Sequence, residues 1–313
     1  MAVHKAYEDE NHMRLSYPVY TFDNRMLFPA GTLIPFGSIE ELISRSEPVS
    51  TERCSLLSHG SVREDLVSYV CRPPYNTVFS EERLISDVFN LMENITHTGP
   101  VLRYLDFFKE NDFYTYRHVL MVSAMSTLLA RDLLPEHRDI LSEAVTGPTH
   151  DFGKLSVPLS ILKKTTPLTT SERDMLRHHT LAGYVLISYY LGDIDSLQAR
   201  VAMSHHERKN GSGYPEGILL SDRMVEIVAT VDIYDALVSP RPYRPISYSN
   251  RTAIEEITAM AERGEMGWDT IKALVSHNRK DKPHYSECGV SLEKRGVPPP
   301  NNTYGITVDN DNI

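Results

Sequence analysis

The feature that most constrains the fold is helical periodicity, which begins near Glu81 and continues to His277. Apolar residues recur there at spacings of three and four, as in Leu84, Val88 and Met92, and this spacing puts them on one stripe of a helix. Successive striped helices bury their apolar faces by packing into a bundle, so we expect a mainly α protein. After the first helix, further helices are expected over residues 101–109, 114–132, 136–150, 170–191, 194–206, 224–237, 250–263 and 268–277. Thr169 and Glu172 have the spacing of a capping box that opens the helix over 170–191.

The segment before the bundle has a different pattern. Two β-prone runs within residues 18–36 flank the polar pair Asp23-Asn24 and predict a hairpin, with a disordered leader as the alternative. Ser38 and Glu41 have capping-box spacing, so a short helix is expected over residues 39–44. We therefore divide the chain into a small mixed α/β regulatory or partner module (1–79), a connecting helix (80–97), an all-helical domain (98–280) and an extended tail (281–313).

Charge and composition exclude several classes of protein. The chain has 32 Lys and Arg against 42 Asp and Glu, a net charge of −10, which argues against a general nucleic-acid or anionic-membrane surface. Cys54, Cys71 and Cys288 form no CxxC pair and leave an odd thiol, so neither a disulfide framework nor a thiolate zinc site is expected. No secretory signal or membrane-length apolar run is visible, which predicts a cytoplasmic location.

The thirteen histidines are the most suggestive part of the composition. Five of them stand with two aspartates at or near the ends of expected helices. Imidazole nitrogen and carboxylate oxygen together suit Fe, Mn or Zn, and a carboxylate can bridge two ions. For any single histidine, a satisfied core or surface position is the better interpretation. The candidate set is His118, His150, Asp151, His179, His205, His206 and Asp232.

The two doublets in this set have flanking signatures of their own. In His150-Asp151-Phe152-Gly153-Lys154, the glycine allows close backbone approach and Lys154 supplies a cation one turn beyond the carboxylate. His205-His206 is followed by Glu207, which we expect to orient a ligand imidazole, and by a Gly213-Tyr214-Pro215 loop that would set an aromatic ring at the site. A structural turn is the alternative for that loop. His178, beside a candidate ligand, is expected to face solvent.

These motifs resemble those of the HD-GYP family, a branch of the HD phosphohydrolase superfamily that hydrolyses cyclic dinucleotide second messengers, chiefly cyclic di-GMP, in bacteria. The resemblance covers about residues 111–276 and implies an all-helical HD-type bundle with a catalytic domain at 98–280. It rests on the two doublets with their flanks, on His179-Thr180-Leu181-Ala182-Gly183, and on Asp232-Ile233-Tyr234-Asp235 with the later Arg241 and Arg244.

The resemblance implies two divalent metal ions, with iron expected and manganese as the alternative. Tyr114 stands where some relatives have a glutamate that helps hold a third metal, which favours two ions here. The implied ligands are His118, His150, Asp151 and Asp232 for one ion, and Asp151, as the bridge, with His179, His205 and His206 for the other.

The same resemblance implies the remaining site residues. Lys154 and Asp112 match polar positions beside the attacking water and the scissile phosphate, and Asp151 completes the catalytic group. Tyr214, Arg241 and Arg244 match guanine- and phosphate-contacting positions, with Gly213 and Pro215 shaping the substrate loop. Two ions lower the pKa of a shared water, so the implied reaction is attack by a metal-bridged hydroxide on a phosphodiester, giving pGpG, GMP or both.

Two other functions stay open. One is a catalytically weak sensor or scaffold that binds the dinucleotide, a GGDEF-type diguanylate cyclase or an adaptor protein; the other is a hydrolase for another cyclic dinucleotide. A homodimer also stays open, whereas nucleic-acid and membrane partners are not expected. The chain departs from the family pattern at Asn210, where an aspartate is usual, and at Gly147-Pro148, which is expected to kink the lead into His150 and to shift its ring.

Overall fold

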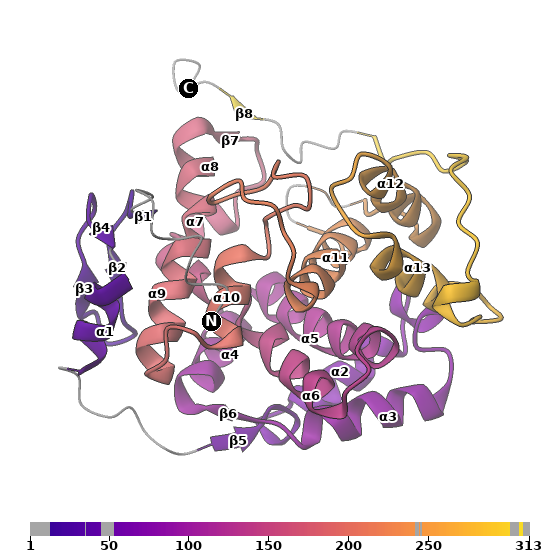
Figure 1. Cartoon of the computed structure of the whole chain (residues 1–313), viewed down its shortest axis with the longest axis horizontal. Helices are drawn as coiled ribbons and strands as arrows, with labels where there is room; N and C mark the ends of the chain where they lie inside the picture. Colours follow the sequence, from indigo (N-terminus) through magenta and orange to yellow (C-terminus); the bar gives the residue numbers. More distant parts are fainter. Residues whose placement is uncertain are drawn as a thin grey trace.

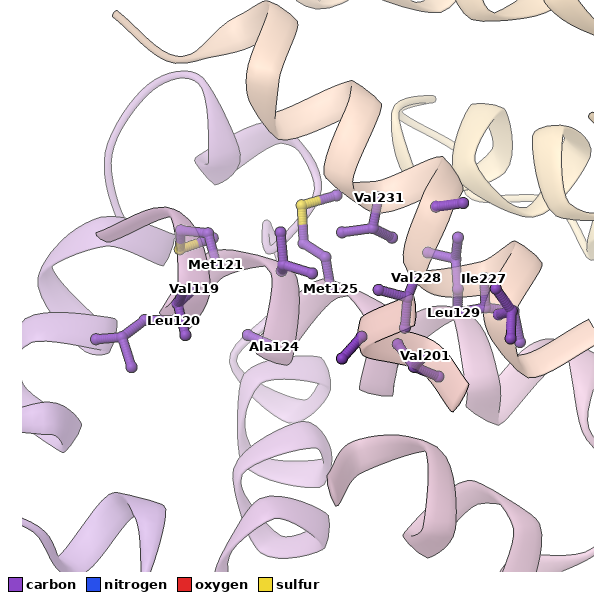
Figure 2. Packing of buried hydrophobic residues seen from close by; sticks show 14 of the residues in the cluster. Val119, Leu120, Met121, Ala124, Met125, Leu129, Val201, Ile227, Val228 and Val231 are labelled. Carbon is purple, nitrogen blue, oxygen red and sulfur yellow. The ribbon is translucent and has the colours of Figure 1, made fainter. Parts of the chain in front are cut away.

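The computed structural model describes residues 13–34, 36–44, 53–241, 244, 246–300 and 307–308. Its centre is the long helix α5 (Phe113–Leu133), whose side chains are buried along most of its length. Helices α3, α4, α6, α11 and α13 pack around α5, and Figure 1 shows this arrangement. Met125 and Leu129 of α5 lie beside Val228 and Val231 of α11 in the core (Figure 2). The predicted mainly α bundle is therefore confirmed.

The helices follow the predicted order, with boundaries that shift by a few residues. The α-helices are α1 (Phe36–Ser44), α2 (Val62–Val70), α3 (Glu82–Glu93), α4 (Gly99–Asn111), α5, α6 (His137–Thr146), α7 (Leu159–Leu162), α8 (Thr170–Arg177), α9 (His179–Leu191), α10 (Leu197–Ser204), α11 (Arg223–Val238), α12 (Asn250–Glu262) and α13 (Trp268–His277). The 3-10 turns are η2 (Leu56–Ser58), η3 (Tyr75–Thr77), η4 (Gly147–Thr149), η5 (Phe152–Ser156) and η6 (Tyr285–Glu287). Within the described residues, no helix combines the length and the apolar character needed to cross a bilayer.

The strands are short and pair two by two. Antiparallel pairs join β1 (Met13–Arg14) to β4 (Leu33–Ile34), β2 (Val19–Tyr20) to β3 (Met26–Phe28), and β5 (Arg53–Ser55) to β6 (Thr96–Thr98). A parallel pair joins β7 (Leu168–Thr169) to β8 (Thr307–Val308). The hairpin predicted at 18–36 is confirmed as β2–β3. The predicted cap at Ser38 is wrong, because α1 begins two residues earlier, at Phe36.

The β2–β3 hairpin packs against the helical domain through Phe22. The Phe22 backbone N–H donates to the Tyr190 hydroxyl at 3.1 Å, and the Arg103 guanidinium lies 5.2 Å from the centre of the Phe22 ring. That ring also meets Phe152 edge-on, with 6.0 Å between ring centres. Phe152 is completely buried and stacks on Tyr104. The hairpin therefore touches the segment that follows Asp151.

Residues 53–79 fold against the bundle as well. Helix α2 packs on α5, and β5 pairs with β6 at the start of α4. The Tyr75 side chain reaches α11, where its hydroxyl lies 2.6 Å from that of Ser239. The boundary at residue 79 stays a prediction, and these contacts favour an earlier one.

Two further segments differ from the sequence expectation. The helix predicted over 170–191 is divided into α8 and α9 at His178, while its predicted capping box of Thr169 and Glu172 is confirmed. His178 is 5% exposed and meets the Tyr17 ring edge-on, so the prediction that it faces solvent is wrong. In the tail, residues 281–300 are extended apart from η6 and lie along α12 and α13, where Gly296 N–H donates to Glu255 at 2.7 Å.

Candidate dinuclear metal site

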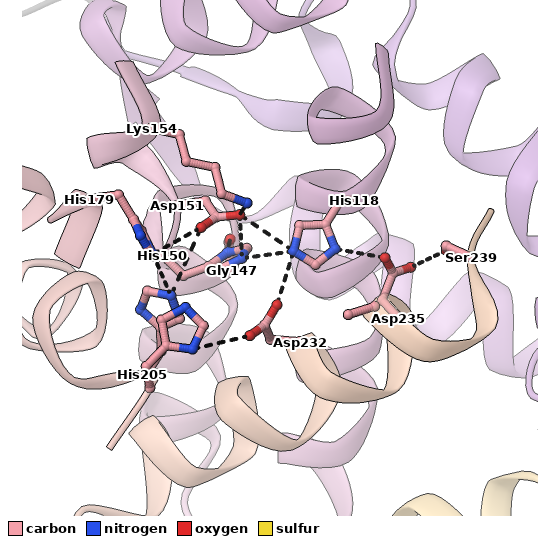
Figure 3. Close-up of polar contacts among 12 residues, drawn as sticks. His118, Gly147, His150, Asp151, Lys154, His179, His205, Asp232, Asp235 and Ser239 are labelled. Carbon is pink, nitrogen blue, oxygen red and sulfur yellow. Dashed lines mark hydrogen bonds and ion pairs between the residues drawn. The ribbon is translucent and has the colours of Figure 1, made fainter. Parts of the chain in front are cut away.

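The structure brings all seven predicted metal ligands together in one buried site, which is formed where several helices begin or end (Figure 3). His118 comes from the second turn of α5, and Asp232 from the middle of α11. The other five lie at breaks between helical segments, where the backbone can turn a side chain inwards. His150 and Asp151 separate η4 from η5, His179 begins α9, and His205 and His206 follow α10.

The ligands form two groups of three. His118, His150 and Asp232 make the first group, and His179, His205 and His206 make the second. Within each group the candidate ligand atoms lie within 4.8 Å of one another. Such clustering of imidazole nitrogens and carboxylate oxygens is the donor set that first-row transition metals prefer. Each group can therefore hold one ion.

Asp151 lies between the two groups and faces both. Its Oδ2 atom is 3.4 Å from His118 Nε2 and 3.3 Å from His150 Nε2, in the first group. Its Oδ1 atom is 3.5 Å from His179 Nε2 and 3.9 Å from His205 Nε2, in the second. One carboxylate thus offers a separate oxygen to each group, which is the arrangement of a bridging ligand.

Backbone carbonyls orient three of the imidazoles. His150 Nδ1 donates to the Gly147 carbonyl at 2.6 Å, and His179 Nδ1 donates to the Leu176 carbonyl at the same distance. His205 Nδ1 donates to the Val201 carbonyl at 3.0 Å. A carbonyl can only accept, so each Nδ1 carries the proton and each Nε2 lone pair is free for a metal. The predicted orienting role of Glu207 is wrong, because its carboxylate instead accepts the Glu216 N–H at 2.8 Å and so holds the following loop.

A carboxylate to which the sequence interpretation gave no role, Asp235, orients the fourth imidazole. His118 Nδ1 lies 2.6 Å from Asp235 Oδ2, while His118 Nε2 points towards Asp232 Oδ1 at 3.1 Å. Asp235 is fully buried and also accepts hydrogen bonds from Tyr75 and Ser239. Asp235 is one helical turn from Asp232 on α11, and this i, i+3 spacing is the signal that could have revealed it.

The surroundings of the site shift several pKa values. Burial lowers the pKa of His179 to about 4 and that of His205 to about 3, which keeps both imidazoles neutral near pH 7. Burial and Arg241 also act to lower the pKa of His118, but the hydrogen bonds that its ring donates to Asp151, Asp232 and Asp235 outweigh them and raise it to about 9. Metal binding at the first group therefore displaces a proton from His118, and affinity there should fall at low pH.

The Gly147-Pro148 departure leaves His150 at the site. These residues form the 3-10 turn η4, which still places the His150 Nε2 atom 3.3 Å from His118 Nε2. The His150 ring therefore lies within the first group of ligands, and the expected shift of the ring relative to other family members stays a prediction. Glycine is required at 147 by packing, because a Cβ atom there would lie 2.4 Å from the Ser123 Cα atom of α5. The close approach lets the Gly147 carbonyl hold the ring.

Gly153 allows the segment after Asp151 to pack directly against α9, which carries a ligand of the second group. A Cβ atom at this position would lie 1.8 Å from the His179 carbonyl oxygen and 2.4 Å from the Gly183 nitrogen. The segment after Asp151 therefore lies directly against the first turn of α9, which begins with His179. This contact fixes the bridging carboxylate relative to the second group of ligands.

The two other predicted catalytic residues lie in different environments. Lys154 Nζ donates to Asp151 Oδ2 at 2.5 Å, so its charge lies directly beside the bridge. Asp112 is buried at the start of α5, where it accepts the Thr115 hydroxyl at 2.7 Å. Among the residues the structure describes, no hydrogen bond or ion pair joins Asp112 to the metal ligands. Its predicted catalytic role stays a prediction.

The Gly213-Tyr214-Pro215 loop folds back onto the second group. The Tyr214 ring stacks on the His206 ring with 4.6 Å between centres, and the Arg177 guanidinium lies 4.7 Å from the Tyr214 ring centre. A Cβ atom on Gly213 would lie 2.4 Å from the His206 carbonyl oxygen, so this close return requires glycine. Pro215 follows through a cis peptide bond. Sequence interpretation did not single out Arg177.

The two predicted substrate-binding arginines differ in their surroundings. Arg241 Nη2 lies 3.2 Å from His118 Nδ1 and 3.7 Å from Asp235 Oδ2, beside the first group. Arg244 is 2% exposed and donates to the carbonyls of Leu237 and Ser239, at the end of α11. Arg244 thus closes a helix end, and its predicted substrate contact stays a prediction.

Comparisons with known proteins agree with this picture. Residues 81–267 match the model of a family described as the HD domain. A cyclic di-GMP phosphodiesterase of Thermotoga maritima is 36% identical over 53% of this chain and 46% of its own length. Cyclic di-GMP phosphodiesterase PA4108 of Pseudomonas aeruginosa is 37% identical over 53% of this chain and 40% of its own. A 3'3'-cGAMP-specific phosphodiesterase 3 of Vibrio cholerae is 37% identical over 42% and 28%.

The chain thus spans less than half the length of these relatives. The family match covers more than half of the chain and includes every one of the seven ligands. The chain therefore belongs to the HD domain family.

Proposed function

We propose that this protein is a metal-dependent phosphodiesterase that hydrolyses cyclic di-GMP to pGpG, GMP or both. The observation that carries the proposal is the position of Asp151, with one oxygen towards each group of three ligands. A pure binding module has no need for two complete groups joined by a bridging carboxylate. The two relatives named as cyclic di-GMP phosphodiesterases support the choice of substrate.

The donor set fits two divalent ions of the first transition row, and we propose iron, with manganese as the alternative. His118, His150 and Asp232 would hold one ion, His179, His205 and His206 the other, and Asp151 both. When bound, the ions supply Lewis-acid activation of water and neutralise charge on the phosphodiester. The imidazoles are suited to this because hydrogen bonds at Nδ1 already direct Nε2 of His150, His179 and His205 into the site.

Other side chains of the chain have roles around this centre. Lys154 is held at the bridge by its hydrogen bond to Asp151, where its ammonium group can donate to a phosphoryl oxygen or to the leaving 3′ oxygen. The Tyr214 ring packs on His206, and the guanidinium of Arg177 packs on the Tyr214 ring. The exposed Arg177 side chain therefore lies next to the second group. Guanidinium groups suit phosphate oxygens and guanine edges because they donate two parallel hydrogen bonds.

Two alternatives are distinguishable from this proposal. A hydrolase for 3'3'-cGAMP is favoured by the Vibrio cholerae relative named for that substrate. A catalytically weak sensor is favoured by the buried state of Arg244, which removes one predicted phosphate contact from the surface. In both cases the metal centre would be retained, so metal content alone cannot separate the three functions.

The test uses protein purified anaerobically and loaded with Fe(II) or Mn(II). Cyclic di-GMP and 3'3'-cGAMP are supplied in parallel, and the products are separated by chromatography. We expect turnover of cyclic di-GMP that disappears in Asp151→Asn and persists in Asp106→Asn, whose exposed carboxylate pairs with His59. Two bound metals with tight dinucleotide binding and no turnover would establish the sensor instead. Preferential turnover of 3'3'-cGAMP would establish the second hydrolase.

A further inference from the structure

A cavity lies away from the metal ligands, between the β5–β6 ribbon and the start of α10. Its volume is about 190 Å³, well above the roughly 10–15 Å³ that a single water requires. Arg53, Thr98 and Val101 line one side, and Asp193, Ser196 and Gln198 line the other. None of the seven metal ligands contributes to its wall, so it is a separate feature of the molecule.

Hydrogen-bond donors without partners gather at one wall of this cavity. Thr98 is the N-cap residue of α4, yet its hydroxyl caps no backbone N–H of the helix. The residue is 8% exposed, and its Oγ1 atom is buried with no hydrogen-bond partner. A buried hydroxyl without a partner is destabilising, so the Thr98 hydroxyl is a donor that a bound acceptor group could satisfy.

The backbone adds further donors at the same place. Gly99 and Val101 are in the first turn of α4, where N–H groups have no acceptor within the helix. Pro100 between them has no N–H. These donors and the positive end of the α4 dipole favour a negatively charged group at this wall.

A cation stands beside these donors. Arg53 pairs directly with Thr98 across the β5–β6 ladder, so the two side chains lie on the same face of the ribbon. Arg53 is exposed, which leaves its guanidinium at the mouth of the cavity. On the opposite wall, the Asp193 carboxylate accepts the Asp195 N–H at 2.9 Å and so belongs to its own turn.

We propose that Arg53, Thr98 and the first turn of α4 form a binding site for a small oxyanion, a phosphate or carboxylate group. The oxyanion would accept the Thr98 hydroxyl and the Gly99 and Val101 N–H groups, and would pair with Arg53. Thr149 also lines the cavity and directly precedes His150 in the chain. An occupant of this site would therefore lie next to the 3-10 turn η4, which directly precedes the metal ligand His150.

The test is calorimetric titration of the metal-loaded full chain with inorganic phosphate and with acetate, at constant ionic strength. We expect saturable binding of one or both, with a dissociation constant raised roughly tenfold by Arg53→Gln and by the isosteric Thr98→Val. Arg138→Gln removes a charge from a side chain that is 88% exposed, and it should leave the constant unchanged. Preference for phosphate over acetate would identify a phosphate-bearing ligand, and the reverse a carboxylate.

Binding at the metal centre is separated by Asp232→Asn, which alters that centre and leaves the cavity intact. Binding that survives in Asp232→Asn and weakens in Arg53→Gln and Thr98→Val supports the site. The proposal is overturned if neither anion binds saturably, or if binding is lost in Asp232→Asn and unchanged in the other two. Equal weakening in Arg138→Gln would also overturn it, because the effect would then be one of net charge.

Discussion

Asp235 offers the sharpest test of how the metal site is built, because it acts on a ligand without being one. Its Oδ2 atom lies 2.6 Å from His118 Nδ1, and its Oδ1 atom accepts from the hydroxyls of Tyr75 and Ser239 (Figure 3). With a metal bound, this carboxylate would hold the remaining His118 proton on Nδ1 and direct Nε2 at the metal position. Replacing such a partner of a metal-ligating histidine typically lowers metal affinity 10–100-fold.

The structure predicts where two replacements fall in that range. Asp235→Asn keeps one oxygen that can accept from His118, so only the negative charge is lost and the effect should be about tenfold, or about 1.4 kcal/mol. Asp235→Ala removes the acceptor, so the proton can move to Nε2 and the effect should approach 100-fold, or about 2.7 kcal/mol. The Tyr75 and Ser239 hydroxyls would not be left unpaired in that variant, because they already lie 2.6 Å from each other.

The assay is equilibrium dialysis against graded Mn²⁺, with bound metal measured by mass spectrometry. The wild-type chain should take up two equivalents, and the variants should shift one of the two binding steps. Asp132→Asn is a matched control, since Asp132 forms a similar pair with His277 at 2.8 Å on a different part of the bundle. If Asp235→Ala leaves both steps unchanged, or if Asp132→Asn shifts them equally, the orienting role is refuted.

Three further predictions concern stability. Gly153→Ala should lower the free energy of unfolding by about 3 kcal/mol or more in urea titrations, because the new Cβ atom would overlap the His179 carbonyl oxygen. Gly99→Ala is the control and should have far less effect, because a Cβ atom at Gly99 meets no atom within 4 Å. Equal effects of the two substitutions would contradict the packing argument. Burial lowers the pKa of His97 to about 4 from an unfolded value near 6.5, so the unfolded state takes up the proton first as the pH falls. Stability should therefore drop by about 2 kcal/mol between pH 7 and pH 5, and His97→Asn should flatten that part of the profile; an unaltered slope would show that another group is responsible. Thr169→Ala removes a capping box and should cost about 1 kcal/mol by thermal unfolding, and no change in melting temperature would show that the cap is not needed.

The helices and the ligand set could be predicted from sequence because both depend on local patterns. Apolar spacing gave α13 its observed bounds, Trp268–His277, and capping chemistry gave the start of α8 at Thr170. The ligands were recognisable because doublets and their flanks are contiguous in the chain. Their division into two groups around Asp151 followed from the family resemblance, and the geometry agrees with it.

What could not be predicted depends on contacts between distant segments. Tyr75 reaches Asp235 across 160 residues of sequence, and nothing in the composition of residues 47–79 indicates that contact. Glu207 shows the opposite case, in which a plausible partner for an imidazole binds a loop instead. The kink expected at Pro148 was judged from helix propensity, whereas packing against Ser123 uses that turn to position His150. Tertiary contacts thus decide the roles of Tyr75, Glu207 and Pro148.

The contact of Phe22 with Phe152 has a consequence for how the two ends of the molecule influence each other. Phe152 is the residue after Asp151, so docking of the hairpin and positioning of the bridging carboxylate share one packed interface. Thermodynamic linkage makes such coupling reciprocal. Undocking of the hairpin would lower the affinity of the site for metal, and metal binding would stabilise the docked hairpin by the same free energy. Solvent exchange at the hairpin amides would then report metal occupancy from outside the site.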